Sequence, residues 1–140
     1  MSPVPFLSRC RMPIAITRDD EQRRVTVTVS DPWSVEEVAV VSDRQVSQQI
    51  WRYGTLYDLR GSTWVPSEPD MAWLVKRGHQ LVALHGARGP VAVLVDPAAP
   101  AHVAQRYADY SGGAGQPYPS RIFVDPVEAA EWLSAHPVAG

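Results

Sequence analysis

Five consecutive apolar residues, Val91 to Val95, lie between Gly89-Pro90 and Asp96-Pro97 and constrain the fold more than any other stretch of the chain. A strand with one face in water alternates polar and apolar residues, and this run does not alternate. A strand that is apolar throughout needs cover on both faces, which parallel sheets with helices above and below provide. The run therefore predicts the central strand of an α/β sheet.

The segments around this run predict alternating strands and helices. Valine alternates with threonine over 24–30, which favours a strand with one buried face. Ser34 and Glu37 have the spacing of a capping box, and Ser67 precedes a proline flanked by two acids, so both serines predict helix starts. The expected strands are 14–18, 24–30, 55–59, 91–95 and 121–124, and the expected helices are 34–50, 67–86, 98–111 and a last one that starts at 125–128 and stops at 136–137.

This order of elements predicts the topology. A hairpin followed by right-handed strand-helix repeats gives a mixed, mostly parallel sheet of about five strands, with an N-terminal antiparallel hairpin and about four helices. The chain has 140 residues, which is within the usual size of one core. We expect a flexible N-terminal tail over 1–13 and a single domain over 14–140.

Charge and cysteine content narrow the classes of function. The formal charge is −2, so the chain has no positive field to attract nucleic acid. Cys10 is the only cysteine, which excludes an intrachain disulfide or thiolate metal site and favours a reducing compartment. No segment has the ~20 apolar residues needed to cross a bilayer. We therefore expect a cytoplasmic protein that neither binds nucleic acid nor inserts into membranes.

Three segments carry a resemblance to a known family. They are the strand and loop over 56–61, the apolar strand 91–95 with the helix end at 104–107, and the closing strand and helix over 121–133. In this order and spacing the chain resembles the SpoIIAA-like branch of the STAS fold, which comprises the anti-sigma-factor antagonists and their uncharacterised relatives. The resemblance covers about Ile14 to Ala135. It implies the STAS fold and a regulatory protein that acts by binding other proteins.

The family resemblance also draws attention to Ser67. In the family, a serine at the start of the second helix is phosphorylated by a partner kinase, and an aspartate precedes it. Here the aligned acid is replaced by Pro66, and Ser67 is the only matching hydroxyl. Ser67 is therefore a possible phosphorylation site, although a helix N-cap alone explains a serine at this place. We expect no phosphoswitch of the usual kind.

The candidate catalytic and metal-binding residues do not form a recognised constellation. Asp58, Asp96 and Asp125 each end a predicted strand, but the last two precede prolines and fit helix N-caps better than a magnesium site. The four histidines lack metal-ligand spacing, and no Gly-x-Ser-x-Gly motif is present. We expect no enzymatic activity, no cofactor and no metal.

The main hypothesis is a protein-binding surface after the strand that ends near Leu59. Ligand and partner surfaces of open sheets lie at the carboxyl ends of the strands, and Trp64 lies in the connector that follows. Exposed tryptophans and arginines are enriched in interfaces. An anti-sigma-type or other regulator is the expected partner, with a homodimer as an alternative, and the predicted contact residues are Asp58, Arg60, Ser62, Trp64, Ser67 and Glu68.

A second hypothesis is a carrier of a small apolar ligand or lipid, because the fold resembles lipid-binding modules. An apolar cleft between the predicted helix 98–111 and the sheet would hold the ligand. Tyr107, Tyr110 and Tyr118 would line its mouth.

Overall fold

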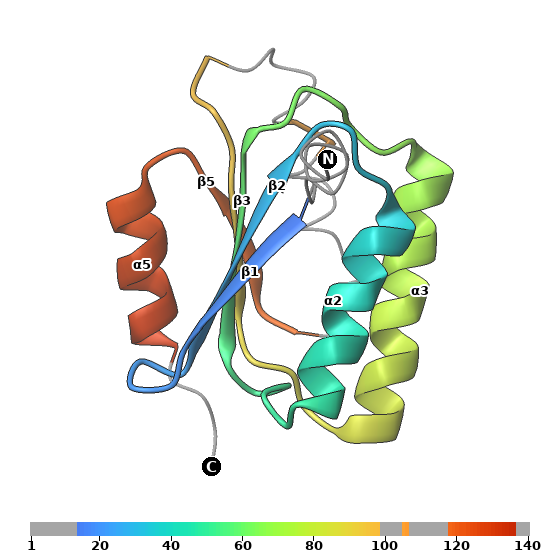
Figure 1. The fold of residues 1–140 in the computed structure, drawn as a ribbon, viewed down its shortest axis with the longest axis vertical. Helices are drawn as coiled ribbons and strands as arrows, with labels where there is room; N and C mark the ends of the chain where they lie inside the picture. Colours follow the sequence, from blue (N-terminus) through green and yellow to red (C-terminus); the bar gives the residue numbers. More distant parts are fainter. Residues whose placement is uncertain (1–13, 99–104, 107–117, 137–140) are drawn as a thin grey trace, which may run out of the picture.

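The computed structural model describes residues 14–98, 105–106 and 118–136, and these form a sheet covered on both faces by helices (Figure 1). The strands are β1 (Ile14–Asp19), β2 (Arg24–Ser30), β3 (Gly54–Gly61), β4 (Val91–Leu94) and β5 (Ser120–Phe123). The helices are α2 (Val35–Ser47), α3 (Glu68–His85) and α5 (Pro126–Ala135). In Figure 1, α2 and α3 lie on one face of the sheet and α5 lies on the other.

The sheet has five strands in the order β1-β2-β3-β4-β5. The first pair is antiparallel, and all later pairs are parallel. This confirms the predicted mixed α/β sheet with its N-terminal hairpin. Because β2 to β5 run in the same direction, their carboxyl ends meet at one edge of the sheet, which we call the carboxyl edge.

The run at 91–95 forms a strand with apolar cover on both sides, as its composition predicts. All four residues of β4 are buried. Val91, Val93 and Val95 belong to the core under α2 and α3, whereas Ala92 and Leu94 belong to a smaller core with residues of α5. Alternate side chains of a strand point to opposite faces, so a strand between two helical layers must be apolar at every residue.

The helix starts agree with the sequence, and one helix end does not. Ser34 and Glu37 form the predicted capping box at α2, and Ser67 and Asp125 cap α3 and α5. However, α2 ends at Ser47 rather than at Ile50, because Gln49 takes a left-handed φ of 63° that turns the chain. Ile50 is buried in the core after that turn, which explains why it continued the apolar pattern of the helix.

The structure describes three helices, where the sequence predicts about four. The predicted helix 98–111 lies almost entirely outside the described residues, and so does the predicted tail 1–13. Among the helices that are described, none is both long enough and apolar enough to span a bilayer.

Candidate functional site

The loop between β3 and α3 is organised by an acid from another strand. Asp31 follows β2 and accepts four hydrogen bonds from this loop. Thr63 donates through its hydroxyl at 2.6 Å and its amide at 2.7 Å, Ser62 donates through its hydroxyl at 2.9 Å, and the amide of Trp64 donates at 3.3 Å. These donors, the Thr63 hydroxyl first, lower the pKa of Asp31 below its usual range.

Two tryptophans meet at this loop. The Trp33 indole donates to the Ser62 hydroxyl at 2.6 Å. Its ring lies 4.7 Å from that of Trp64, edge to face at 87°. Trp33 is buried with 8% of its surface exposed, whereas Trp64 keeps 39% exposed. The buried Trp33 ring therefore packs against the inner side of the half-exposed Trp64 ring. Asp31 fixes the backbone of the loop that contains Trp64.

Asp58 and Arg60 form an ion pair on β3. The Arg60 Nε and a terminal guanidinium nitrogen donate to the two carboxylate oxygens of Asp58 at 3.0 and 2.8 Å. This contact lowers the pKa of Asp58, and the two carboxylates of Asp58 and Asp96 both contribute to a raised pKa of Arg60. The structure thus places Arg60 in an acidic environment, with Asp58 as its bidentate partner.

The last two predicted contact residues lie at the start of α3. The Ser67 hydroxyl accepts from the amide of Asp70 at 3.2 Å, which is the N-cap contact predicted from the sequence. Glu68 is the first residue of the helix and is exposed. The six predicted residues therefore divide into the Asp58–Arg60 pair, the loop residues Ser62 and Trp64, and the helix start.

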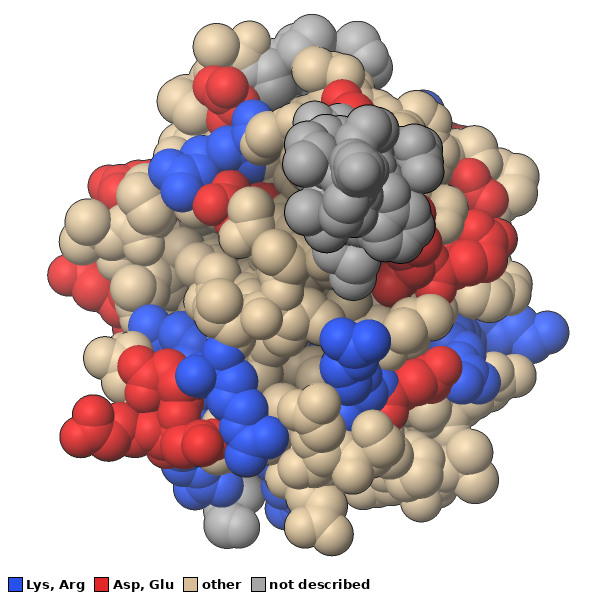
Figure 2. Space-filling model, in the orientation of Figure 1, with Lys and Arg blue, Asp and Glu red and all other residues tan. Residues whose placement is uncertain are grey.

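Acidic residues dominate this end of the molecule. The first turns of α2 and α3 both carry acids, and Figure 2 shows acidic side chains gathered over these helix ends. Elsewhere on the face shown in Figure 2, acidic and basic side chains alternate. The described acids near the carboxyl edge are Asp31, Glu36, Glu37, Asp58, Glu68, Asp70, Asp96, Asp125 and Glu128.

These acids do not form a metal site. In the described parts of the chain, no three His, Cys, Asp or Glu side chains are close enough to hold a metal ion. Asp96 and Asp125 instead accept backbone hydrogen bonds from Ala98 at 2.8 Å and from Val127 at 2.9 Å. Both contacts satisfy amides at chain turns, as expected for an acid followed by proline.

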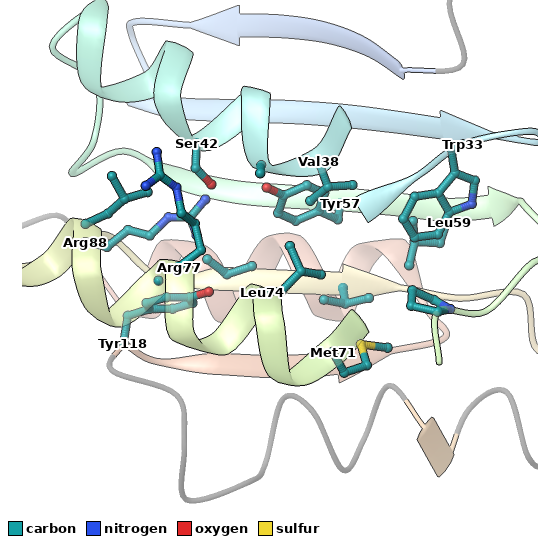
Figure 3. A pocket seen from close by; sticks show the side chains of 16 residues that line it. Trp33, Val38, Ser42, Tyr57, Leu59, Met71, Leu74, Arg77, Arg88 and Tyr118 are labelled. Atoms are coloured by element: carbon teal, nitrogen blue, oxygen red, sulfur yellow. The ribbon is translucent and has the colours of Figure 1, made fainter. Parts of the chain in front are cut away.

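A second candidate site is an apolar pocket of about 70 Å³ between the sheet and the two helices α2 and α3. Figure 3 shows Arg77, Arg88 and Tyr118 at one end and Trp33 and Met71 at the other. Residues of α2, α3, β3 and β4 line the space between, and they include Val38, Tyr57, Leu59, Leu74, Leu81 and Val93.

The predicted ligand site agrees with this pocket at one residue. Tyr118 lies in the lining, whereas Tyr107 and Tyr110 fall outside the described residues. The pocket lies between the sheet and the helices α2 and α3, and most of the helix 98–111, beside which the sequence predicts the cleft, lies outside the described residues.

Arg88 is the buried cation of the pocket. Arg88 is 7% exposed, and its guanidinium carbon lies 4.9 Å from the ring centroid of Trp51 and 4.9 Å from that of Tyr118. It donates to the Gln45 side chain at 2.8 Å, and Gln45 donates to the Thr55 hydroxyl at 2.8 Å. Two aromatic rings and the Gln45 amide therefore contact this guanidinium.

Sequence reasoning missed Asp31, Trp33 and Arg88 as site residues. The partners of Asp31 are 31 to 33 residues away, so no local motif shows them. The one local signal near Arg88 was Gly89. A Cβ at Gly89 would collide with the carbonyl oxygens of Arg52 and Tyr53, so the glycine allows the chain beside Arg88 to approach the turn that carries Trp51.

Comparison with known proteins adds no relative. No model of a known protein family matches the chain, and no curated protein matches it in sequence. The resemblance to anti-sigma-factor antagonists therefore stays a prediction, and function has to be inferred from the geometry described above.

Proposed function

We propose that this protein is a non-enzymatic regulatory module that binds a positively charged surface of another protein at the loop between β3 and α3. The observation that carries the proposal is the fixation of this loop by Asp31, which presents Trp64 to solvent. An anti-sigma-type regulator is the class of partner that the sequence resemblance suggests.

Preorganisation of the loop favours recognition. An exposed loop does not need an acid that accepts four hydrogen bonds to satisfy its backbone, because water would do so. Fixing a loop in advance removes part of the entropy cost of binding. A half-exposed tryptophan on a fixed support is the kind of anchor that contributes most of the energy of an interface. Trp64 supported by Trp33 has these properties.

Charge indicates the chemistry of the partner. Glu68 and Asp70 lie in the first turn of α3, beyond Trp64 in the chain, and Glu36 lies in the first turn of α2. Arg60 is engaged by Asp58. A partner with lysine or arginine side chains would pair with the acids and would place a cation over the Trp64 ring. An acidic partner would be repelled.

The same acids argue against a phosphoswitch at Ser67. The hydroxyl of Ser67 is engaged as the N-cap of α3. A phosphate there would gain from the helix N-terminus but would meet Glu68 and Asp70. We expect phosphate mapping by mass spectrometry on protein from its native cells to find Ser67 unmodified. Stoichiometric phosphate on Ser67 would contradict this part of the proposal.

The recognition surface is tested by comparative affinity capture from the native cells. Wild type, Trp64→Ala and Glu68→Lys are used as baits, and Trp73→Ala on the outside of α3 is the matched control, since Trp73 is similarly exposed at 42%. We expect a basic protein that is captured by wild type and Trp73→Ala, is lost with the other two baits and is released by salt. Identical captured sets for all four baits would overturn the proposal.

Sedimentation of the same variants distinguishes a partner from self-association. Because the surface is acidic, two copies would repel each other there, and we expect wild type to sediment as a monomer. A concentration-dependent dimer that Trp64→Ala abolishes would identify a second copy as the occupant, and would contradict the basic partner.

A further inference from the structure

We infer that a pocket at the amino edge of the sheet binds the phosphoryl group of a small molecule through the side chains of Arg23 and Arg52. The amino edge is the end of the sheet at which β2 to β5 begin, opposite the carboxyl edge. This site is therefore separate from the protein-binding surface proposed for the loop after β3, and either one can exist without the other.

Three segments that are far apart in the sequence form this amino-edge pocket. They are the turn 20–23 between β1 and β2, the turn 48–53 between α2 and β3, and the end of α3, all at the lower end of the molecule in Figure 1. The pocket measures about 350 Å³, which falls within the ~300–1,000 Å³ of typical small-molecule sites. Its described lining residues include the basic side chains of Arg23, Arg52 and His85, and no acid.

Hydrogen bonds between these segments fix the frame of the amino-edge pocket. The carbonyl of Arg23 accepts from the amide of Gly54 at 3.1 Å, which joins the first turn to the start of β3. The indole of the buried Trp51 donates to the carbonyl of Gly86 at 2.9 Å, which joins the second turn to the end of α3. The backbone that carries the basic side chains is thus held in place before a ligand binds, which lowers the entropy cost of binding.

The two arginines of this pocket have no charged partner. Within the described residues, the guanidinium groups of Arg23 and Arg52 form no ion pair and no hydrogen bond, and that of Arg23 lies 5.9 Å from the ring centroid of Tyr53. By contrast, the neighbouring Arg24 donates to the Ser134 hydroxyl of α5 at 3.1 Å. Both arginines of the pocket can therefore donate to a ligand.

One acid lies behind the pocket wall. Asp20 does not line the pocket, but it accepts a hydrogen bond from the hydroxyl of Tyr53, a lining residue, at 2.6 Å. Asp20 also forms an ion pair with Arg18 at 2.7 Å. The charge of Asp20 is thus balanced by Arg18, and the positive charges of Arg23 and Arg52 remain in excess at the pocket.

The ends of α2 and α3 explain some of the positive charge at this edge, but not these two arginines. Cations near a helix C-terminus are stabilised by the helix dipole, and Arg44 and His85 lie in the last turns of α2 and α3. Arg23 and Arg52 lie in turns outside any helix. In the described part of the chain, Arg23 and Gln49 are the two non-glycine residues with a left-handed φ, at 52° and 63°, and both line the pocket. Long polar side chains thus occupy two positions that glycine would fit with less strain.

The placement of the donors favours a phosphoryl group over a carboxylate. Each guanidinium presents parallel N–H groups to anionic oxygens, and the ring of His85 adds a third donor. Donors on three separate segments reach a ligand from different sides. A carboxylate has two oxygens in one plane, whereas a phosphoryl group has three that point in different directions. All three basic side chains are exposed, so a bound dianion keeps part of its hydration.

The test is a titration of the full chain at constant pH and ionic strength, followed by nitrogen-15 NMR, with phenyl phosphate, benzoate and inorganic phosphate as probes. Benzoate keeps the ring of phenyl phosphate and replaces the phosphoryl group by a carboxylate. We expect saturable amide shifts at Gln49, Arg52 and Tyr53 with phenyl phosphate, and binding of benzoate that is weaker by about 10-fold. Both phosphates should bind. Tighter binding of phenyl phosphate would identify an ester as the ligand, and equal affinity would identify free phosphate.

Single substitutions separate the site from the general charge of this edge. Arg52→Gln removes one cation without removing a described ion pair, so the unfolding midpoint should stay that of wild type. We expect Arg52→Gln and Arg23→Gln each to weaken phenyl phosphate binding by about 10-fold. Arg44→Gln is the matched control, because Arg44 is an exposed cation in the last turn of α2 and does not line the pocket. It should change the affinity by less than about 2-fold, since salt screens distant charges. Trp64→Ala, at the protein-binding loop, should leave the affinity unchanged.

Three results would overturn the inference. The first is equal affinity of wild type for phenyl phosphate and benzoate. The second is an equal loss of affinity with Arg44→Gln and Arg52→Gln, which would indicate a diffuse positive field in place of a site. The third is the absence of saturable shifts at the lining residues with both phosphates.

Discussion

At the scale of single residues, Asp31 joins the end of β2 to the loop after β3 by four hydrogen bonds, more than any other described side chain makes between them. Removing its charge by Asp31→Asn keeps the shape but turns an acceptor into a donor that faces the amide of Thr63 or Trp64. We expect a loss of about 1–2 kcal/mol in the free energy of unfolding. Asp43→Asn is the control, because Asp43 has one exposed ion pair and its loss should cost under about 0.5 kcal/mol.

The lowered pKa of Asp31 predicts that the free energy of unfolding depends on pH. Hydrogen bonds from Thr63 lower the pKa of Asp31 below its ordinary value of 3.8 in the folded state. A lowered folded pKa stabilises the fold above the unfolded pKa, and this contribution disappears as the pH falls through the folded pKa. In urea unfolding, the gap between wild type and Asp31→Asn should therefore be widest near about pH 7 and should narrow toward about pH 3. A gap that widens in acid would refute this assignment.

How far single residues could be predicted depends on how local their contacts are. The N-cap role of Ser67 involves a residue three positions away, so its sequence neighbours show it. The contact of Trp33 with Ser62 spans 29 residues and exists only because β2 and β3 are adjacent. No pattern within a short window contains that information.

At the scale of elements, the caps decide where helices begin. Replacing the Ser67 hydroxyl in Ser67→Ala removes the acceptor for the Asp70 amide, and we expect a cost of about 1 kcal/mol in thermal or urea unfolding. Ser67→Asp restores an acceptor at a helix N-terminus and should remain within a few tenths of a kcal/mol of wild type. Equal stability of all three proteins would show that the cap contributes nothing.

The close approach beside Arg88 depends on glycine. A Cβ at Gly89 would meet the carbonyl oxygens of Arg52 and Tyr53, which are main-chain atoms and cannot move away cheaply. We expect Gly89→Ala to lower the free energy of unfolding by more than about 2 kcal/mol.

Gly61→Ala is the matched control for this prediction. Its Cβ would lie 3.5 Å from the Val29 carbonyl oxygen, an ordinary contact, so the change should be small. Equal unfolding midpoints for the two variants would contradict the close approach at Gly89.

Elements were more predictable than their ends. The strict alternation over 24–30 and the apolar run at 91–95 reflect burial on one face or both, and each strand appears where its pattern indicates. The predicted end of α2 was three residues too late. Ile50 is buried in the core after the helix has ended, and its position continues the helical spacing of apolar residues.

At the scale of the whole molecule, the location of the candidate sites follows from topology. Parallel strands from β2 to β5 bring their carboxyl ends to one edge, and the loop with Trp64 is there, as the general rule for open sheets predicts. The polar end of the pocket could not be predicted in the same way. Its contacts join Arg88 to Gln45 and Trp51, which come from separate segments of the chain.

The two candidate sites share one side chain. Trp33 lines the pocket and also supports Trp64 at the protein-binding loop. Trp33→Phe removes the indole donor to Ser62 and part of the ring that faces Trp64. We therefore expect two effects from one substitution: a loss of about 1–2 kcal/mol in the free energy of unfolding, and faster solvent exchange of the Trp64 indole proton in NMR spectra.

A substitution of the same type elsewhere makes this prediction specific. Trp73→Phe changes an exposed ring on α3 that is 42% accessible, and it should shift the free energy of unfolding by less than about 0.5 kcal/mol. It should also leave the exchange of the Trp64 indole proton unchanged. If Trp33→Phe destabilises the fold but leaves Trp64 exchange as in wild type, then Trp33 is only a core residue, and the support of the loop has to come from Asp31 alone. If both effects appear together, the pocket and the loop are coupled through Trp33. A molecule that fills the pocket against Trp33 should then also slow the solvent exchange of the Trp64 indole proton.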